Sequence, residues 1–175
     1  MPAIAHVGVG FAAKRIAPGI NVIYLILAAE LIEIIFFVFV IAGAENMPLP
    51  DKPPFSPYSH GLFMGIMWSV IAAALSFLIS RNRKTSFIIG ALVLSHTILD
   101  LIASPKLAFY PTDTEMPVFF NNSLSMGLGL WKNSTVAYIG EFGILVTGLT
   151  IYSLTLKNKK LVSGNDADTE ISVKE

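Results

Sequence analysis

The chain has 175 residues, of which 54% are hydrophobic and 14% are charged, and its mean hydropathy is +0.67. Soluble domains carry roughly 25% charged residues, so this composition predicts a membrane protein. The formal net charge is zero, which gives no support to a nucleic-acid partner, and the absence of cysteine excludes disulfides, thiolate zinc sites and cysteine nucleophiles. A metal ion could be held only by histidines and carboxylates.

The first segment, residues 2–17, is apolar but too short to cross a bilayer. It contains His6 and two glycines and ends at Lys14 and Arg15. We expect a short helix there, which either dips into the membrane domain or lies flat on the membrane surface.

Four later stretches have the roughly 20-residue apolar length that crosses a bilayer. They are residues 21–43, 60–80, 85–103 and 134–156. Each is expected to be a helix, because backbone polar groups in hydrocarbon must be satisfied within their own segment. Asn21 and Ser59 are predicted to cap the first two of these helices. Small residues in the second and fourth spans predict close helix packing; they include Gly65, Ser69, Gly140, Gly143 and Gly148.

Basic residues flank the spans in three clusters, at residues 14–15, 81–84 and 157–160. The positive-inside rule places all three on the cytoplasmic side. The sequence therefore predicts an inner-membrane, multi-pass protein with both termini in the cytoplasm. The expected fold is all-α: a bundle of four transmembrane helices with a short N-terminal helix, forming one domain over residues 1–156. Residues 157–175 lack an apolar period and are expected to form a disordered cytoplasmic tail.

Ionisable residues lie inside three of the spans. His96 and Asp100 are four residues apart and Glu30 and Glu33 three apart, so each pair shares a helix face. Counted from the basic end of each span, these four residues and Glu141 all fall at depths of about 15–22 Å. A charged side chain at such depth costs at least ~2.5–3.5 kcal/mol, so a functional site is the default interpretation.

Histidines and carboxylates without cysteine suit zinc, manganese or iron, and such a site with an open position can activate water. The same acids could instead form a proton or cation relay. Internal ion pairs are less favoured, because the four spans contain no lysine or arginine. Glu141 could act as a base, support a ligand, or be a protonated glutamate bonded to a backbone carbonyl.

Three motifs carry a family resemblance: residues 6–11 (HVGVGF), 58–61 (YSHG) and 95–100 (SHTILD). They resemble the small bacterial inner-membrane proteins described as membrane-bound metal-dependent hydrolases, which are related to the zinc-dependent phospholipase C and nuclease superfamily. The resemblance covers most of residues 3–156. It implies an all-helical site that binds one or more divalent metal ions, with zinc the first expectation. The ligands it implies are His6, Glu33, His60, His96 and Asp100.

The chain departs from this family pattern at two positions. Relatives carry aspartate where this chain has Glu33, and they often have a further histidine near position 104, where this chain has Ser104. The first change lengthens one ligand by a methylene. The second implies fewer bound metals or a member that no longer hydrolyses its substrate.

The resemblance implies a hydrolase in which metal-activated water attacks a phosphoester or similar bond. Glu141 is then the candidate catalytic residue, either as a base or by orienting a ligand histidine. A site at this depth is reached more readily from the bilayer, so a lipid or lipid-linked substrate is expected, although the residues also allow another small molecule. The alternatives are a small permease or ion-coupled transporter that uses the same acids, and an inactive scaffold.

Overall fold

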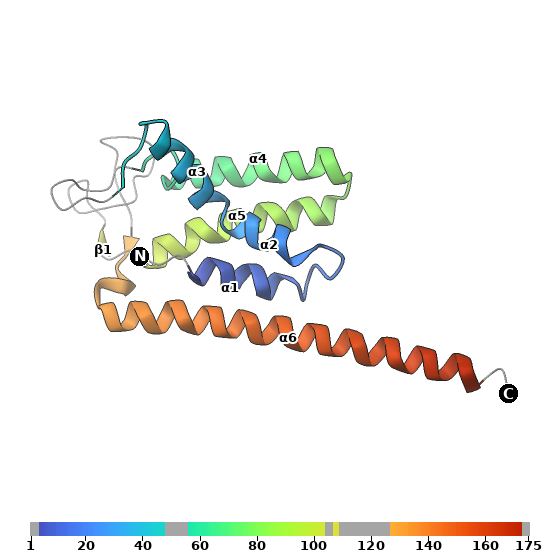
Figure 1. The fold of residues 1–175 in the computed structure, drawn as a ribbon. Coiled ribbons are helices and arrows are strands. Elements are labelled where there is room, and N and C mark those ends of the chain that lie inside the picture. Colours follow the sequence, from blue (N-terminus) through green and yellow to red (C-terminus); the bar gives the residue numbers. More distant parts are fainter. Residues whose placement is uncertain (1–3, 48–55, 104–106, 109–126, 173–175) are drawn as a thin grey trace.

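The computed structural model describes residues 4–47, 56–103, 107–108 and 127–172 (Figure 1). Its helices are α1 (Ile4–Ala13), α2 (Val22–Ala29), α3 (Leu31–Ile41), α4 (Leu62–Ser80), α5 (Arg83–Ala103) and α6 (Ser134–Ser172), with a 3-10 turn at Leu130–Lys132. Two short strands, β1 (Leu107–Ala108) and β2 (Gly127–Leu128), pair antiparallel. The all-α prediction and the short N-terminal helix are confirmed.

Three helices are long and apolar enough to cross a membrane: α4, α5 and the Ser134–Asn158 part of α6. Helices α2 and α3 pass the same test only as a pair, and they are bent by 56° where they meet. The described chain therefore has three spans, or four if the bent pair is one span.

The expectation of one helix across residues 21–43 is wrong, because the helix breaks at Glu30. The residues from Val22 to Ile41 include no glycine or proline, so the local sequence gives no cause for a break. The cause is tertiary: the His96 ring of α5 binds the carbonyl oxygen of Ala29, the last residue of α2. A side chain that takes a backbone acceptor in this way is a known source of helix kinks. The start of α2 is as predicted, since Asn21 Oδ1 accepts the Ile23 N–H at 3.0 Å.

Helix α1 dips into the bundle, where it packs against α6, α2 and α5. Glycines allow this approach, because a Cβ on Gly148 would lie 2.0 Å from the Gly8 carbonyl oxygen. A Cβ on Gly10 would likewise lie 2.7 Å from the Ile26 Cα. The packing role predicted for Gly143 is not seen among the described residues, since none of them outside its own stretch of helix lies within 4 Å of a Cβ built there.

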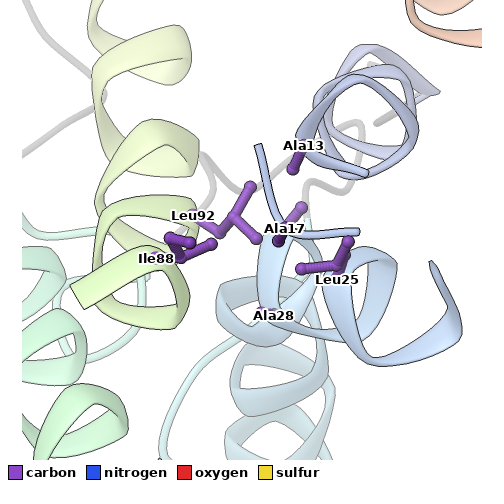
Figure 2. Packing of buried hydrophobic residues seen from close by; sticks show 7 residues of the cluster. Ala13, Ala17, Leu25, Ala28, Ile88 and Leu92 are labelled. Carbon is purple, nitrogen blue, oxygen red and sulfur yellow. The ribbon is translucent and has the colours of Figure 1, made fainter. Parts of the chain in front are cut away.

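The hairpin of α4 and α5 is packed just as closely. A Cβ on Gly65 would lie 2.1 Å from Thr97 Oγ1, and the Ser69 hydroxyl donates to the Gly90 carbonyl at 2.7 Å. A core of mostly small side chains joins α1, α2 and α5 (Figure 2). Its buried members are Ala13, Ala17, Leu25, Ala28, Ala29, Ile88 and Leu92.

The connection from α1 to α2, the turn from α4 to α5 and the part of α6 that follows Leu156 lie at the same end of the molecule (Figure 1). These segments carry the three basic clusters, so the clusters share one end as predicted. Helix α1 runs toward that end, so the start of α1 lies away from the C-terminal end of α6 (Figure 1). The predicted location of both termini in the cytoplasm stays a prediction, because residues 1–3 and 173–175 lie outside the described residues.

Helix α6 continues to Ser172, through residues for which the sequence predicts a disordered tail. Residues 157–172 contain no proline and one glycine, so nothing in their backbone chemistry forces the helix to end at the bilayer surface.

Candidate metal centre

The five ligands implied by the family resemblance come together in the structure. We call them the His/carboxylate cluster: His6 of α1, Glu33 of α3, His60 in the turn before α4, and His96 and Asp100 of α5. They form two overlapping trios that share His96, and within each trio the donor atoms lie within 4.8 Å of one another. One trio adds His6 and Asp100, and the other adds Glu33 and His60.

The donor atoms of the cluster lie close enough together to be ligands of one ion, and also close enough to form ion pairs. Asp100 Oδ2 lies 3.2 Å from His96 Nε2, and Asp100 Oδ1 lies 3.4 Å from His6 Nε2. Glu33 Oε1 lies 3.6 Å from His60 Nε2 and 3.9 Å from His96 Nε2. Hydrogen bonds between such atoms usually measure about 2.7–3.2 Å, whereas tetrahedral ligands about 2.1 Å from a metal lie about 3.4 Å apart. The shortest distance, between His96 and Asp100, lies within the hydrogen-bond range, and the 3.4 Å distance between His6 and Asp100 matches the spacing of two tetrahedral ligands.

The inward-facing atoms are buried and lack hydrogen-bond partners. The side chain of His96 is 0% exposed, and neither its Nε2 nor Asp100 Oδ2 has a hydrogen bond within the described structure. Buried polar atoms are rarely left without a partner, because the loss of hydration is not compensated. Because the two atoms lie 3.2 Å from each other, an ion pair between them and a role as ligands of one ion both fit.

The orientation of His96 follows from its other ring nitrogen. His96 Nδ1 lies 2.8 Å from the Ala29 carbonyl oxygen, which can only accept a hydrogen bond. A neutral His96 ring therefore carries its proton on Nδ1, and the lone pair of its Nε2 then points toward Glu33 and Asp100. This arrangement is the one that metal-binding histidines commonly adopt.

His6 is held by stacking. Its ring lies parallel to that of His96, with centroids 3.7 Å apart and planes 11° apart. Helix α1 begins directly before it, and the Ala5 N–H donates to Glu141 Oε2 at 2.7 Å. Glu141 thus fixes the end of α1 that carries His6, a position consistent with the expected support of a ligand histidine. Neither trio includes Glu141, so its predicted role as a base stays a prediction.

Glu30 and Glu33 are three residues apart, and the structure places them differently. Glu33 belongs to a trio, whereas Glu30 sits at the break between α2 and α3 and belongs to neither. One oxygen of Glu30, Oε1, is buried without a hydrogen bond in the described structure. Position 104, where relatives have a further histidine, lies outside the described residues.

Glu45 is not among the residues predicted from the sequence, and Ser59 does not have its predicted role as a helix cap. Ser59 does not cap α4, whose N-cap is Gly61. Its hydroxyl instead lies between Glu45 Oε2, at 2.6 Å, and His60 Nδ1, at 2.8 Å. The only feature of the sequence that marks Glu45 is its position as an acidic residue just beyond the predicted span 21–43. The helix-cap interpretation was wrong because the chain turns at residues 57–60 and brings this serine onto the loop after α3.

Comparison of the chain with protein-family models, curated proteins and solved structures gave no match.

Proposed function

We propose that this protein is a membrane-bound metal-dependent hydrolase with four spans, the bent pair of α2 and α3 counting as one. The basic end of the bundle faces the cytoplasm of the bacterial cell, and the His/carboxylate cluster faces the outer half of the membrane. The supporting observation is the convergence of five donor atoms from four parts of the chain, with the His96 ring oriented by the Ala29 carbonyl.

The charge of the cluster supports a divalent cation. Three neutral imidazoles with two ionised carboxylates carry a charge of −2, which one divalent ion balances. Without a cation, Glu33 and Asp100 would face each other across His60 and His96 with no lysine or arginine in the spans. Burying such uncompensated charges is costly. The donors are nitrogen and oxygen, which fits zinc.

A bound divalent ion supplies Lewis-acid polarisation and makes water a stronger nucleophile near neutral pH. The residues of the chain do the rest. His6, His60 and His96 with the two carboxylates hold the ion, Ala29 orients His96, and Glu141 anchors the start of α1 beneath His6.

The proposed substrate is a phosphoester in a lipid or lipid-linked molecule. The bundle exposes large apolar side chains on α3, α4 and α6, as expected for surfaces in contact with acyl chains. A substrate already dissolved in the bilayer can reach a cluster at this depth without crossing a polar phase.

Metal analysis of the purified protein tests this proposal. In detergent, the wild type is expected to hold at least one equivalent of zinc after dialysis, and the double variant His96→Ala/Asp100→Ala close to none. Zinc-dependent release of phosphate-containing headgroups in proteoliposomes, lost in the same variant, would support the reaction class. Substoichiometric metal that the substitutions leave unchanged would overturn the proposal.

A second candidate function is ion-coupled transport. The break between α2 and α3 beside the cluster favours it, because discontinuous helices often build ion sites in transporters. Proteoliposome currents or uptake that Glu33→Gln abolishes, in protein that contains little metal, would favour this candidate over the hydrolase.

A further inference from the structure

Glu45 is a buried carboxylate outside the His/carboxylate cluster. It is 4% exposed and accepts three hydrogen bonds. Its Oε1 receives the backbone N–H groups of Tyr58 and Ser59 at 2.7 and 2.9 Å, and its Oε2 receives the Ser59 hydroxyl at 2.6 Å. An ionised carboxylate can only accept, so the hydroxyl proton of Ser59 points at Glu45.

This arrangement determines the tautomer of His60. With its proton given to Glu45, the Ser59 oxygen has only lone pairs to offer to His60 Nδ1, which lies 2.8 Å away. The ring proton of neutral His60 must then be on Nδ1. Its Nε2 carries the lone pair, and this atom lies 3.6 Å from Glu33 Oε1 and 3.9 Å from Asp100 Oδ2.

The turn that carries His60 is fixed by further contacts. The His60 N–H donates to the Ser56 carbonyl at 2.9 Å, and Trp68 Nε1 donates to the Tyr58 carbonyl at 2.8 Å. The ring of Phe36 meets the imidazole edge to face at 5.3 Å. Because the backbone of the turn is held in these ways, the Ser59 hydroxyl can be removed without removing every support of the turn.

A second Ser-His pair in the chain behaves differently. The Ser95 hydroxyl donates to the Leu92 carbonyl at 2.7 Å, and His96 Nδ1 is bonded to Ala29 instead of to its neighbouring serine. The two serines thus occupy the same sequence position relative to a histidine, but in the described structure only Ser59 is hydrogen-bonded to the imidazole that follows it. Ser95 is therefore a matched control.

We propose that Glu45 is a positioning residue that acts through Ser59 to hold His60 with Nε2 as the free ligand nitrogen. The predicted effect on metal affinity rests on the proposed function, whereas the effect on the tautomer does not. Hydrogen bonds to the outer nitrogen of a ligand histidine typically change metal affinity 10–100-fold.

The test uses the full-length protein in detergent, labelled with ¹⁵N-histidine. The chain has three histidines, so three rings are observed, and they are assigned with single His variants. Spectra of the metal-free protein at mildly alkaline pH report the tautomer of each neutral ring. Zinc affinity is measured on the same samples by competition with a chromophoric chelator. The variants are Ser59→Ala, Ser59→Thr, Glu45→Gln and the control Ser95→Ala.

We expect Ser59→Ala and Glu45→Gln to move His60 toward the Nε2–H tautomer and to leave the signals of His6 and His96 in place. Zinc affinity should fall about 10–100-fold in both variants. Ser59→Thr keeps a hydroxyl and should retain the wild-type His60 tautomer and zinc affinity. Ser95→Ala should change neither property. An unchanged His60 tautomer in Ser59→Ala and Glu45→Gln overturns the proposal. A tautomer change in protein that binds no zinc supports the positioning role and contradicts the metal centre.

Discussion

His96 and Ala29 are joined by a hydrogen bond of 2.8 Å between a buried imidazole on α5 and the last carbonyl of α2. The contact has two consequences. It leaves Nε2 of His96 as the nitrogen that faces Asp100, and it accompanies the 56° bend between α2 and α3. The geometry of the His/carboxylate cluster and the shape of the first span therefore have a common cause.

Removing this hydrogen bond should straighten the first span. In His96→Leu the Ala29 carbonyl becomes available to the backbone of α3, and the distance between Ile23 and Ile41 should increase by about 3 Å. Both positions are exposed and the chain has no cysteine, so spin labels on Ile23→Cys and Ile41→Cys can report the distance by pulsed electron resonance. Asp100→Asn is the control, because it leaves the contact with Ala29 in place. An equal distance in all three proteins would assign the bend to other contacts.

Glu33 and Glu30 should differ in their effect on metal binding. Glu33→Gln removes a donor of the His/carboxylate cluster and should lower zinc affinity at least 100-fold. Glu30→Gln changes an acid of the same region that lies outside both trios, and its affinity should stay within about threefold of wild type. Competition titration of the two detergent-purified variants measures the difference. A larger loss in Glu30→Gln would identify that residue as the ligand.

Gly148 and Gly143 offer a matched pair on α6. A Cβ on Gly148 would lie 2.0 Å from the backbone oxygen of Gly8, so Gly148→Ala should push α1 away from α6. Overpacking of this kind costs about 1–3 kcal/mol. Gly143 has nothing within 4 Å of a Cβ, so Gly143→Ala should be neutral or stabilise the helix by up to about 1 kcal/mol. Thermal unfolding in one detergent compares them. Equal melting temperatures would contradict the close contact of α1 with α6.

The membrane orientation can be tested with single cysteines in this naturally cysteine-free chain. Lys84 in the basic cluster after α4 and Lys132 just before α6 are both exposed, and the proposed topology places them on opposite sides of the membrane. An impermeant maleimide added to intact spheroplasts should label Lys132→Cys and not Lys84→Cys. Both should be labelled after the membrane is permeabilised. The reverse pattern in intact spheroplasts would show that the basic end faces outward.

Part of the site could be predicted from the sequence, because ionisable residues within an apolar span are costly to bury in a membrane and can be recognised without a structure. His96, Asp100 and Glu33 are ionisable residues within apolar runs, and their spacing places them on defined helix faces. His6 and His60 were included only through the family resemblance, since neither lies at the depth of the others by residue counting. The structure brings both to the cluster because α1 enters the bundle and the turn before α4 folds inward.

Other features have no local signal. Glu45 and Ser59 are 14 residues apart and meet only because the chain returns after α3 to start α4. The break at Glu30 has no glycine or proline to mark it, and Gly143 resembles Gly148 in sequence although only Gly148 lies against another backbone.

The sequence by itself determined which segments are apolar helices and which ionisable groups they carry. Hydropathy and helix periodicity depend only on residues that are close together in the sequence. It also predicted the shared end of the basic clusters. Only the tertiary structure decided that α1 lies inside the bundle, that the first span is bent, and which nitrogen of each histidine faces the carboxylates. Those features depend on hydrogen bonds and close contacts between segments far apart in the chain, such as Ala29 with His96.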